Sequence, residues 1–282
     1  MEKILVYFAI KYEGDWDRIY KAINMKEKVD SDEMDSMLEN HNEKYITLIS
    51  DNYPSKLKNI YKPPFVLFYR GDESLLEEMS IAVIGSRENS EYGEKVTKDL
   101  TAQLVDKKCS IISGLAQGID AIAHKTALEK NGKTIAVLGN GLDVFYPNCN
   151  KELQKEIELK GLVISEYPNK VQPNKENFPI RNRIVAGLSS GVLVTEAKKK
   201  SGTMITVARA LEMGKEVFCV PNNLYDESGC NTLIKEGAKL VENANDILNE
   251  LWYFYWLNKI YEIISIRKGE EDIEINNSRI TN

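Results

Sequence analysis

Short turns rich in glycine, serine and threonine recur along this 282-residue chain, each directly after a short apolar run. The backbone N–H groups of a glycine turn can approach an anion closely, and a helix N-terminus adds a favourable dipole and unsatisfied donors. The chemistry open to these turns is therefore the binding of phosphate groups. From the turns we select as candidate binding residues Ser86, Arg87, Ser113, Gly114, Gly141, Ser201, Gly202 and Thr203.

The segment 173–187, PNKENFPIRNRIVAG, places cations around one aromatic ring. Basic side chains suit phosphate, an aromatic ring offers a face on which an unpaired base stacks, and an amide can bond a base edge. The same letters also fit a solvated charged loop whose aromatic residue anchors it to the core. From this segment, interpreted as a loop, we add as candidates Lys175, Phe178, Arg181, Asn182 and Arg183.

None of the turns fits a nucleotide cofactor. Gly139-Asn140-Gly141 lacks the third glycine of the dinucleotide fingerprint, and no glycine turn ends in the Lys-Ser/Thr of a P-loop. We therefore predict no bound NAD, ATP or other cofactor. Four cysteines without C-x-x-C spacing and only two histidines favour structural thiols over a metal site.

Several carboxylates admit other interpretations. Asp120 and His124 lie four residues apart, so a helix would place them on one face as a possible acid–base pair. No nucleophile accompanies them, and a structural bond between the helix and a loop is the favoured interpretation. Glu166 would repel phosphate, and we expect it to orient Arg181 or Arg183.

The elements that position these residues form a regular pattern from residue 81 onwards, where β-branched runs alternate with amphipathic windows. This pattern is typical of an α/β, Rossmann-like, doubly wound and mostly parallel sheet with helices on both faces. In such a sheet the turns beyond the strands' carboxyl ends meet at one edge, so the candidates should gather there. The predicted strands are 81–85, 110–113, 134–139, 162–165, 191–196, 216–220 and 239–242, and the predicted helices are 91–106, 118–131, 150–160, 202–214 and 229–236.

Outside this pattern the chain divides into three parts. Residues 1–45 are predicted to form one or two short helices, 46–250 the Rossmann-like domain, and 251–282 a C-terminal helix and polar tail. The apolar runs fall short of the roughly 20 residues that a bilayer helix requires, and the N-terminus lacks the features of a signal peptide. We expect a cytoplasmic protein without membrane contact.

Charge is distributed unevenly. The net charge of −6 argues against a nucleic-acid partner. Yet residues 1–40 hold ten acids and six bases, 241–282 hold eight and four, and 170–215 hold three acids and nine bases. The basic central segment can therefore present a phosphate-binding face.

Eight strings in this order resemble the DNA-processing protein A family (DprA, also called Smf): IAVIGSR, SGLAQGIDAIAH, TIAVLGNGLDVFYP, GLVISEYP, FPIRNRIVAGLS, VTEAKKKSGTMIT, EVFCVPN and GCNTLIKEGA. The resemblance runs from about residue 45 to about residue 248. It implies a homodimer, without enzymatic activity, that binds and protects single-stranded DNA and loads the RecA recombinase during natural transformation. It also implies that Arg87, Lys175 and Phe178 contact the DNA, with Arg181 and Arg183 beside them.

The sequence departs from the family pattern in two places. Many members have Pro-Gly where this chain has Pro221-Asn222, and asparagine tolerates the positive φ of such a turn. Many members also carry a C-terminal winged-helix domain, and we expect none here because too few residues follow residue 251.

Two other classes of function remain open. A nucleoside-monophosphate phosphoribohydrolase of the same superfamily would use Glu196 with Ser201-Gly202-Thr203, although its P-G-G-x-G-T-x-x-E string is absent. A pure interaction protein would use the aromatic cluster Trp252 to Trp256 as a docking surface, and core packing or a dimer contact explains that cluster as well.

Overall fold

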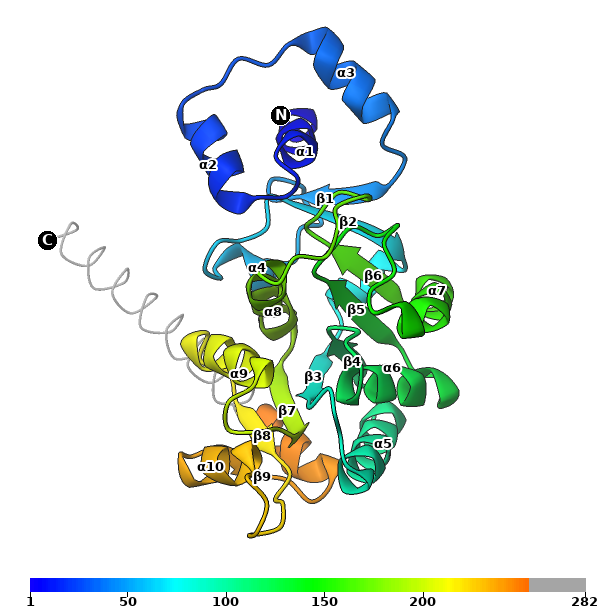
Figure 1. Cartoon of the computed structure of the whole chain (residues 1–282), viewed down its shortest axis with the longest axis vertical. Helices are drawn as coiled ribbons and strands as arrows, with labels where there is room; N and C mark the ends of the chain where they lie inside the picture. The colour runs from blue at the N-terminus through cyan, green and yellow to red at the C-terminus, as the bar shows by residue number, and fades with distance from the viewer. Residues whose placement is uncertain (254–282) are drawn as a thin grey trace, which may run out of the picture. The chain divides into compact units, whose positions relative to one another are not determined.

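A mostly parallel sheet of nine strands organises the part of the chain that the structure describes (Figure 1). The structure is a computed structural model, and it describes residues 1–253. The chain divides into two compact units, Met1–Val241 and Glu242–Asn282. Of the second unit, residues 242–253 are described, and 244–253 are helical.

The elements of the first unit follow one another in chain order. They are α1 (Glu2–Lys11), α2 (Trp16–Asn24), α3 (Ser31–Glu39), β1 (Lys44–Thr47), α4 (Ser55–Lys58), β2 (Val66–Gly71), η1 (Glu73–Leu76), β3 (Ser80–Gly85), α5 (Glu91–Asp106), β4 (Ser110–Ser113), α6 (Ile119–Glu129), β5 (Thr134–Leu138), η2 (Asn148–Asn150), α7 (Lys151–Lys160), β6 (Leu162–Ser165), α8 (Asn177–Leu188), β7 (Gly191–Glu196), α9 (Gly202–Glu212), β8 (Val217–Cys219), α10 (Gly229–Lys235) and β9 (Lys239–Leu240).

The sheet is doubly wound. Its strand order is β1-β2-β6-β5-β4-β3-β7-β8-β9, so the chain builds outwards from β3 first through β4, β5 and β6, and then in the other direction through β7 and β8. These strands are parallel, whereas β1 and β2 form an antiparallel edge beside β6. The direction of winding reverses between β3 and β7. In open α/β sheets, this reversal point is where ligands bind, outside the carboxyl ends of the strands.

Both faces of the sheet are covered, which is why the central strands β3 to β7 are buried at almost every position. In β5, Ile135 and Val137 pack into one core cluster, and Ala136 and Leu138 pack into the other. Successive side chains of a strand point to opposite faces, so this alternation places one cluster on each side. Figure 1 shows α8, α9 and α10 on one side, and α5, α6 and α7 on the other.

Three helices precede the sheet, where the sequence analysis expects one or two. The side chains of Asp15 and Asp30 accept hydrogen bonds at the starts of α2 and α3, and such N-caps favour separate helices. Val6 and Phe8 of α1 pack with Phe68 of β2 in one core cluster. The N-terminal helices therefore belong to the same compact unit as the sheet.

The predicted elements after residue 80 match the structure closely. Helix α5 covers the predicted 91–106, and Ser90 caps it by accepting a hydrogen bond of 3.0 Å from the Gly93 backbone N–H. Over residues 1–253, no helix combines the length and apolarity that crossing a membrane requires. The aromatic cluster of the sequence analysis begins at Trp252, and its residues from 254 onwards lie outside the described part of the chain.

Helix α8 corrects the sequence analysis, which interprets 173–187 as a loop. Pro179 lies in the first turn of α8, where a missing N–H removes no intrahelical bond. Arg181 and Arg183 occupy buried positions of the helix, so the apolar stripe that identifies a helix is interrupted.

Candidate nucleic-acid interface

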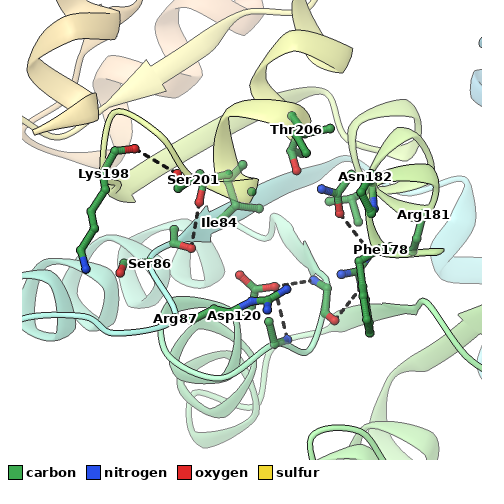
Figure 2. Close-up of a pocket in the computed structure, with 18 of the residues that line it drawn as sticks. Ile84, Ser86, Arg87, Asp120, Phe178, Arg181, Asn182, Lys198, Ser201 and Thr206 are labelled. Atoms are coloured by element: carbon green, nitrogen blue, oxygen red, sulfur yellow. Dashed lines mark hydrogen bonds between the residues drawn. The ribbon is translucent and has the colours of Figure 1, made fainter. Parts of the chain in front are cut away.

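A cavity of about 500 Å³ lies at the reversal point of the sheet (Figure 2). Its walls come from the turns after β3, β4, β5 and β7 and from the first turns of α8 and α9. Ten of the thirteen candidate residues line it: Ser86, Arg87, Gly114, Lys175, Phe178, Arg181, Asn182, Ser201, Gly202 and Thr203. We call this cavity the switch-point pocket.

The turn after β3 supplies an exposed cation on a fixed backbone. The Ser86 hydroxyl donates to the Glu88 carbonyl at 2.9 Å, and the Ser86 backbone N–H donates to the Glu196 carbonyl at 2.8 Å. Ser86 is therefore buried in the turn that it shapes, while the Arg87 side chain is exposed. The Arg87 guanidinium carbon lies 5.9 Å from the centre of the Phe178 ring.

Arg181 forms part of the pocket wall and is only 4% exposed. Its guanidinium donates to the carbonyl of Gly114 at 2.6 Å and also to the carbonyl of Val137. A Cβ on Gly114 would lie 2.5 Å from an Arg181 nitrogen, so the close approach requires glycine at this position. Burial lowers the pKa of Arg181 to about 10, which still leaves the side chain charged at neutral pH.

Phe178 and Lys175 stand on the α8 side of the pocket. The Phe178 ring rests over Gly139, where an added Cβ would lie 2.8 Å from a ring carbon. The ring remains partly exposed, and Lys175 is exposed before the helix starts. The Asn182 carbonyl oxygen accepts a 3.2 Å hydrogen bond from Arg181, so its amide NH₂ group remains a donor.

The start of α9 forms the opposite wall. The Ser201 hydroxyl donates to the Lys198 carbonyl at 3.0 Å, and the Thr203 hydroxyl donates to the Gly85 carbonyl at 3.0 Å. These bonds fix the helix start beside the turn after β3. The first N–H groups of a helix have no intrahelical acceptor, so this end can donate to an anion.

Three candidates lie outside the lining of the pocket. The buried Ser113 hydroxyl donates to the Val83 carbonyl at 2.7 Å, and the buried Gly141 N–H donates to the Val171 carbonyl at 2.9 Å. Arg183 is 2% exposed and forms a two-pronged ion pair with Glu166, at 2.8 and 2.6 Å. Ser113, Gly141 and Arg183 therefore hold neighbouring segments in place and do not face the pocket. Glu166 orients Arg183, as the sequence analysis expects.

The carboxylates considered for catalysis have structural partners. Glu196 accepts hydrogen bonds from the backbone N–H and the hydroxyl of Ser90, at the N-terminus of α5. Asp120 accepts from the backbone N–H of Gly114 at 3.1 Å, and His124 bonds the Thr134 hydroxyl at 2.6 Å. Burial raises the pKa of Asp120 and lowers that of His124 to about 3. The expected bond between the helix and a loop is present at Asp120, which bonds Gly114 in the turn after β4.

Among the lining residues that the sequence analysis did not select are Tyr146, Lys198 and Thr206. Lys198 is exposed and lies 3.2 Å from the exposed Glu88 carboxylate. Tyr146 is 45% exposed. Its position after a predicted strand was the available signal. Thr206 lies one helical turn beyond the predicted helix start and carried no signal of its own.

Comparison with known proteins identifies the family. DNA processing protein DprA of Streptococcus pneumoniae is 50% identical over 210 residues, which are 72% of this chain and 73% of that protein. An X-ray structure of the S. pneumoniae protein matches with a TM-score of 0.77 and 38% identity, covering 89% of this chain and 98% of that one. A structure of DNA processing protein A from Helicobacter pylori, described for its single-stranded DNA binding mode, matches with a TM-score of 0.68 and 34% identity over 75% of this chain and 97% of that one.

A family model described as DNA recombination-mediator protein A matches residues 44–252, which begin at β1 and end within the second compact unit. This range includes every residue that lines the switch-point pocket. The chain belongs to the DNA recombination-mediator protein A family.

Proposed function

We propose that this protein binds single-stranded DNA in the switch-point pocket, with phosphates held by Arg87, Lys175 and the α9 start, and a base stacked on Phe178. The observation that carries the proposal is the convergence of these groups. Arg87, Lys175 and Lys198 are exposed cations, they come from three different turns, and they line one cavity at the reversal point. Phosphate contacts from separate turns suit a flexible backbone, and a partly exposed ring suits bases that are not paired.

The wider role follows the family. We propose a cytoplasmic homodimer that shields incoming single-stranded DNA and delivers it to the RecA recombinase during natural transformation. The family membership and the H. pylori relative support a DNA-processing role of this kind. We also propose that the DNA-binding domain covers about residues 46–250, after a helical segment over 1–45 and before a C-terminal part over 251–282.

Direct binding measurements test the DNA-binding part of the proposal. Fluorescence anisotropy with a labelled 15-mer of dT and a labelled 15-bp duplex should show tighter binding of the single strand, since paired bases cannot stack on Phe178. We expect Arg87→Ala and Lys175→Ala each to weaken single-strand binding more than tenfold. Their thermal midpoints should stay within about 2 °C of the wild type, because surface substitutions change stability by about 0.5 kcal/mol or less.

The matched control is Lys130→Ala. Lys130 is also an exposed cation, but it follows α6 and precedes β5, which places it at the opposite end of the strands. This variant removes the same charge and should bind the 15-mer like the wild type. Equal losses in all three variants would mean that net charge alone is responsible, and equal affinity for the two DNA forms would contradict the proposal.

A further inference from the structure

We propose that Tyr146 joins Phe178 in a two-ring platform on which nucleobases of the bound single strand stack. The inference rests on the proposed function and adds a residue to it, since it assigns Tyr146 together with Phe178 to base stacking at the pocket. The first observation is the ring pair itself. The two ring centres lie 5.5 Å apart with 30° between their planes, and both side chains line the switch-point pocket.

The two rings come from segments that are far apart in the chain. Tyr146 lies in the segment between β5 and η2, and Phe178 lies in the first turn of α8. Phe178 is supported from below by Gly139 and has the Arg87 guanidinium nearby. Tyr146 keeps 45% of its surface exposed although its neighbour Phe178 is available to cover it. The pair therefore leaves aromatic surface open beside three cations.

The backbone on both sides of Tyr146 is held by buried amides. The Asn140 NH₂ group donates to the carbonyls of Gly141 and Val144 at 2.9 and 2.6 Å. The Asn150 NH₂ group donates to the carbonyl of Leu115 at 3.0 Å, in the turn after β4. Asn140 is 1% exposed and Asn150 5% exposed, so these bonds are shielded from water. A ring held in this way loses little conformational freedom when a ligand stacks on it.

The chemistry of the surroundings favours a nucleobase over another flat ligand. An aromatic platform beside cations matches the alternation of base and phosphate along a single strand, and stacking tolerates any base because every base has a π-face. Exposed aromatic surface costs solvation free energy unless a partner covers it. The Tyr146 and Phe178 rings at the mouth of a cationic cavity are therefore arranged for the bases of the same strand whose phosphates the cations hold.

The experiment separates base contacts from phosphate contacts. Affinities of the full chain are measured for a 15-mer of dT and for a 15-mer with the same number of phosphates in which every base is replaced by an abasic tetrahydrofuran unit. We expect the wild type to prefer the dT strand. Tyr146→Ala should reduce that preference by about five- to 150-fold, the range that alanine substitution of a base-stacking ring gives. Tyr146→Phe keeps the ring and should keep the preference.

Tyr92→Ala is the matched control, since Tyr92 is exposed to a similar extent, 47%, and does not line the pocket. Circular dichroism melts verify that each variant is folded. A wild type that binds both strands equally, or a Tyr146→Ala variant that retains the full preference, overturns the inference while the phosphate contacts stand. Absence of binding to either strand would instead overturn the proposed function, and with it the platform. Equal losses for both strands in Tyr146→Ala would mean that Tyr146 only supports the pocket.

Discussion

Two arginines of α8 lie two positions apart and have different environments. Arg181 lines the switch-point pocket, with its guanidinium on backbone carbonyls, whereas Arg183 faces Glu166 inside the protein. The side chains of the Arg183 and Glu166 pair are 2% and 4% exposed, and Arg183 also donates to the Lys62 carbonyl at 2.9 Å. Removing one member of such a pair leaves a buried charge without its partner, which is far costlier than losing a surface pair.

We therefore predict that Arg183→Met lowers the free energy of unfolding by about 3–5 kcal/mol. The double variant with Glu166→Met should recover a large part of this loss, because it leaves neither charge buried alone. Urea titration monitored by circular dichroism measures both values. If the double variant is as unstable as the sum of the two single variants, the two side chains do not interact energetically and the ion-pair argument fails.

The buried His124 predicts a pH dependence of stability. Burial lowers its pKa from 6.5 to about 3, so the folded protein resists protonation that the unfolded chain accepts. The stabilising effect is complete above pH 6.5 and is lost as the pH falls towards 3, at roughly 1 kcal/mol for each pH unit. Urea titrations between pH 7.5 and pH 4.5 should show a steeper loss in the wild type than in His124→Gln. Parallel pH profiles of the two proteins would rule out this assignment.

At the residue scale, the sequence predicted which residues line the pocket, but it did not predict which side chains are buried and which are exposed. Glycine, serine and basic residues after the strands gave ten lining residues, because the topology of a doubly wound sheet brings those turns together. The sequence predicted that Glu166 would orient Arg181 or Arg183, but it did not show which of the two arginines or that Arg183 would be buried, because only the folded chain brings Arg183 and Glu166 within 2.6 Å.

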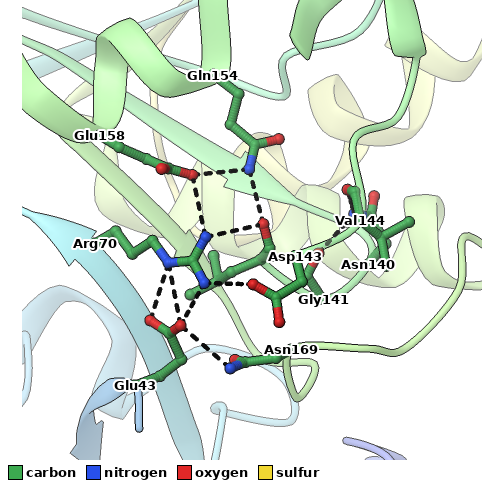
Figure 3. Close-up of polar contacts among 10 residues, drawn as sticks. Glu43, Arg70, Asn140, Gly141, Asp143, Val144, Gln154, Glu158 and Asn169 are labelled. Carbon is green, nitrogen blue, oxygen red and sulfur yellow. Dashed lines mark hydrogen bonds and ion pairs between the residues drawn. The ribbon is translucent and has the colours of Figure 1, made fainter. Parts of the chain in front are cut away.

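A network around Arg70 joins β2, α7 and two connecting segments at the edge of the sheet (Figure 3). Arg70 of β2 donates to Glu43 at 3.0 and 3.1 Å and to Asp143 at 2.6 Å, and lies 3.6 Å from Glu158 of α7. The hydrogen bonds that Arg70 donates to Glu43 and Asp143 raise the pKa of Arg70. The network ties the antiparallel edge and α7 to the segment that carries Tyr146. One cation holds three carboxylates, so its loss would leave them to repel one another.

Arg70→Met should therefore loosen the segment over 140–146 more than the rest of the sheet. Two of its amides are informative, because Gly141 N–H donates to the Val171 carbonyl at 2.9 Å and Asp143 N–H to the Asn169 carbonyl at 3.0 Å. We expect hydrogen exchange of peptides covering these amides to accelerate at least tenfold, while those covering β7 change little. Arg209→Met is the control, since the ion pair of Arg209 is with the exposed Glu212 of its own helix, and Arg209 also lies over the Tyr61 ring, away from this segment. Equal exchange in both variants would show that the network does not brace the segment.

At the element scale, the strands and most helices after residue 80 could be predicted because their apolar periodicity is intact. Helix α8 was missed for a physical reason. Two of its buried positions hold arginines whose charges are satisfied by backbone carbonyls and by Glu166, and both kinds of partner are distant in sequence. A pattern of apolar residues cannot identify a helix that buries cations. One of these buried cations, Arg181, also forms part of the pocket wall.

At the scale of the whole molecule, an acidic protein keeps a cationic site. The net charge is −6, yet Arg87, Lys175 and Lys198 all reach the switch-point pocket as exposed side chains. Charges that lie more than about 8 Å from a bound strand are largely screened at physiological salt. The three cations act at contact distance, so they and not the net charge should determine binding.

The dependence of binding on salt concentration tests whether the pocket cations or the net charge of the protein determine DNA binding. Each phosphate neutralised on a single strand contributes a slope of about −0.7 to the plot of log affinity against log salt concentration. Three exposed cations therefore predict a slope near −2 for the wild type. Arg87→Ala and Lys175→Ala should each reduce its magnitude by about 0.7, and Lys130→Ala should leave it unchanged because it removes the same charge far from the pocket. A flat wild-type slope would contradict phosphate contacts altogether. A slope that Lys130→Ala reduces as strongly as Arg87→Ala would mean that the whole surface, and not one pocket, attracts the strand.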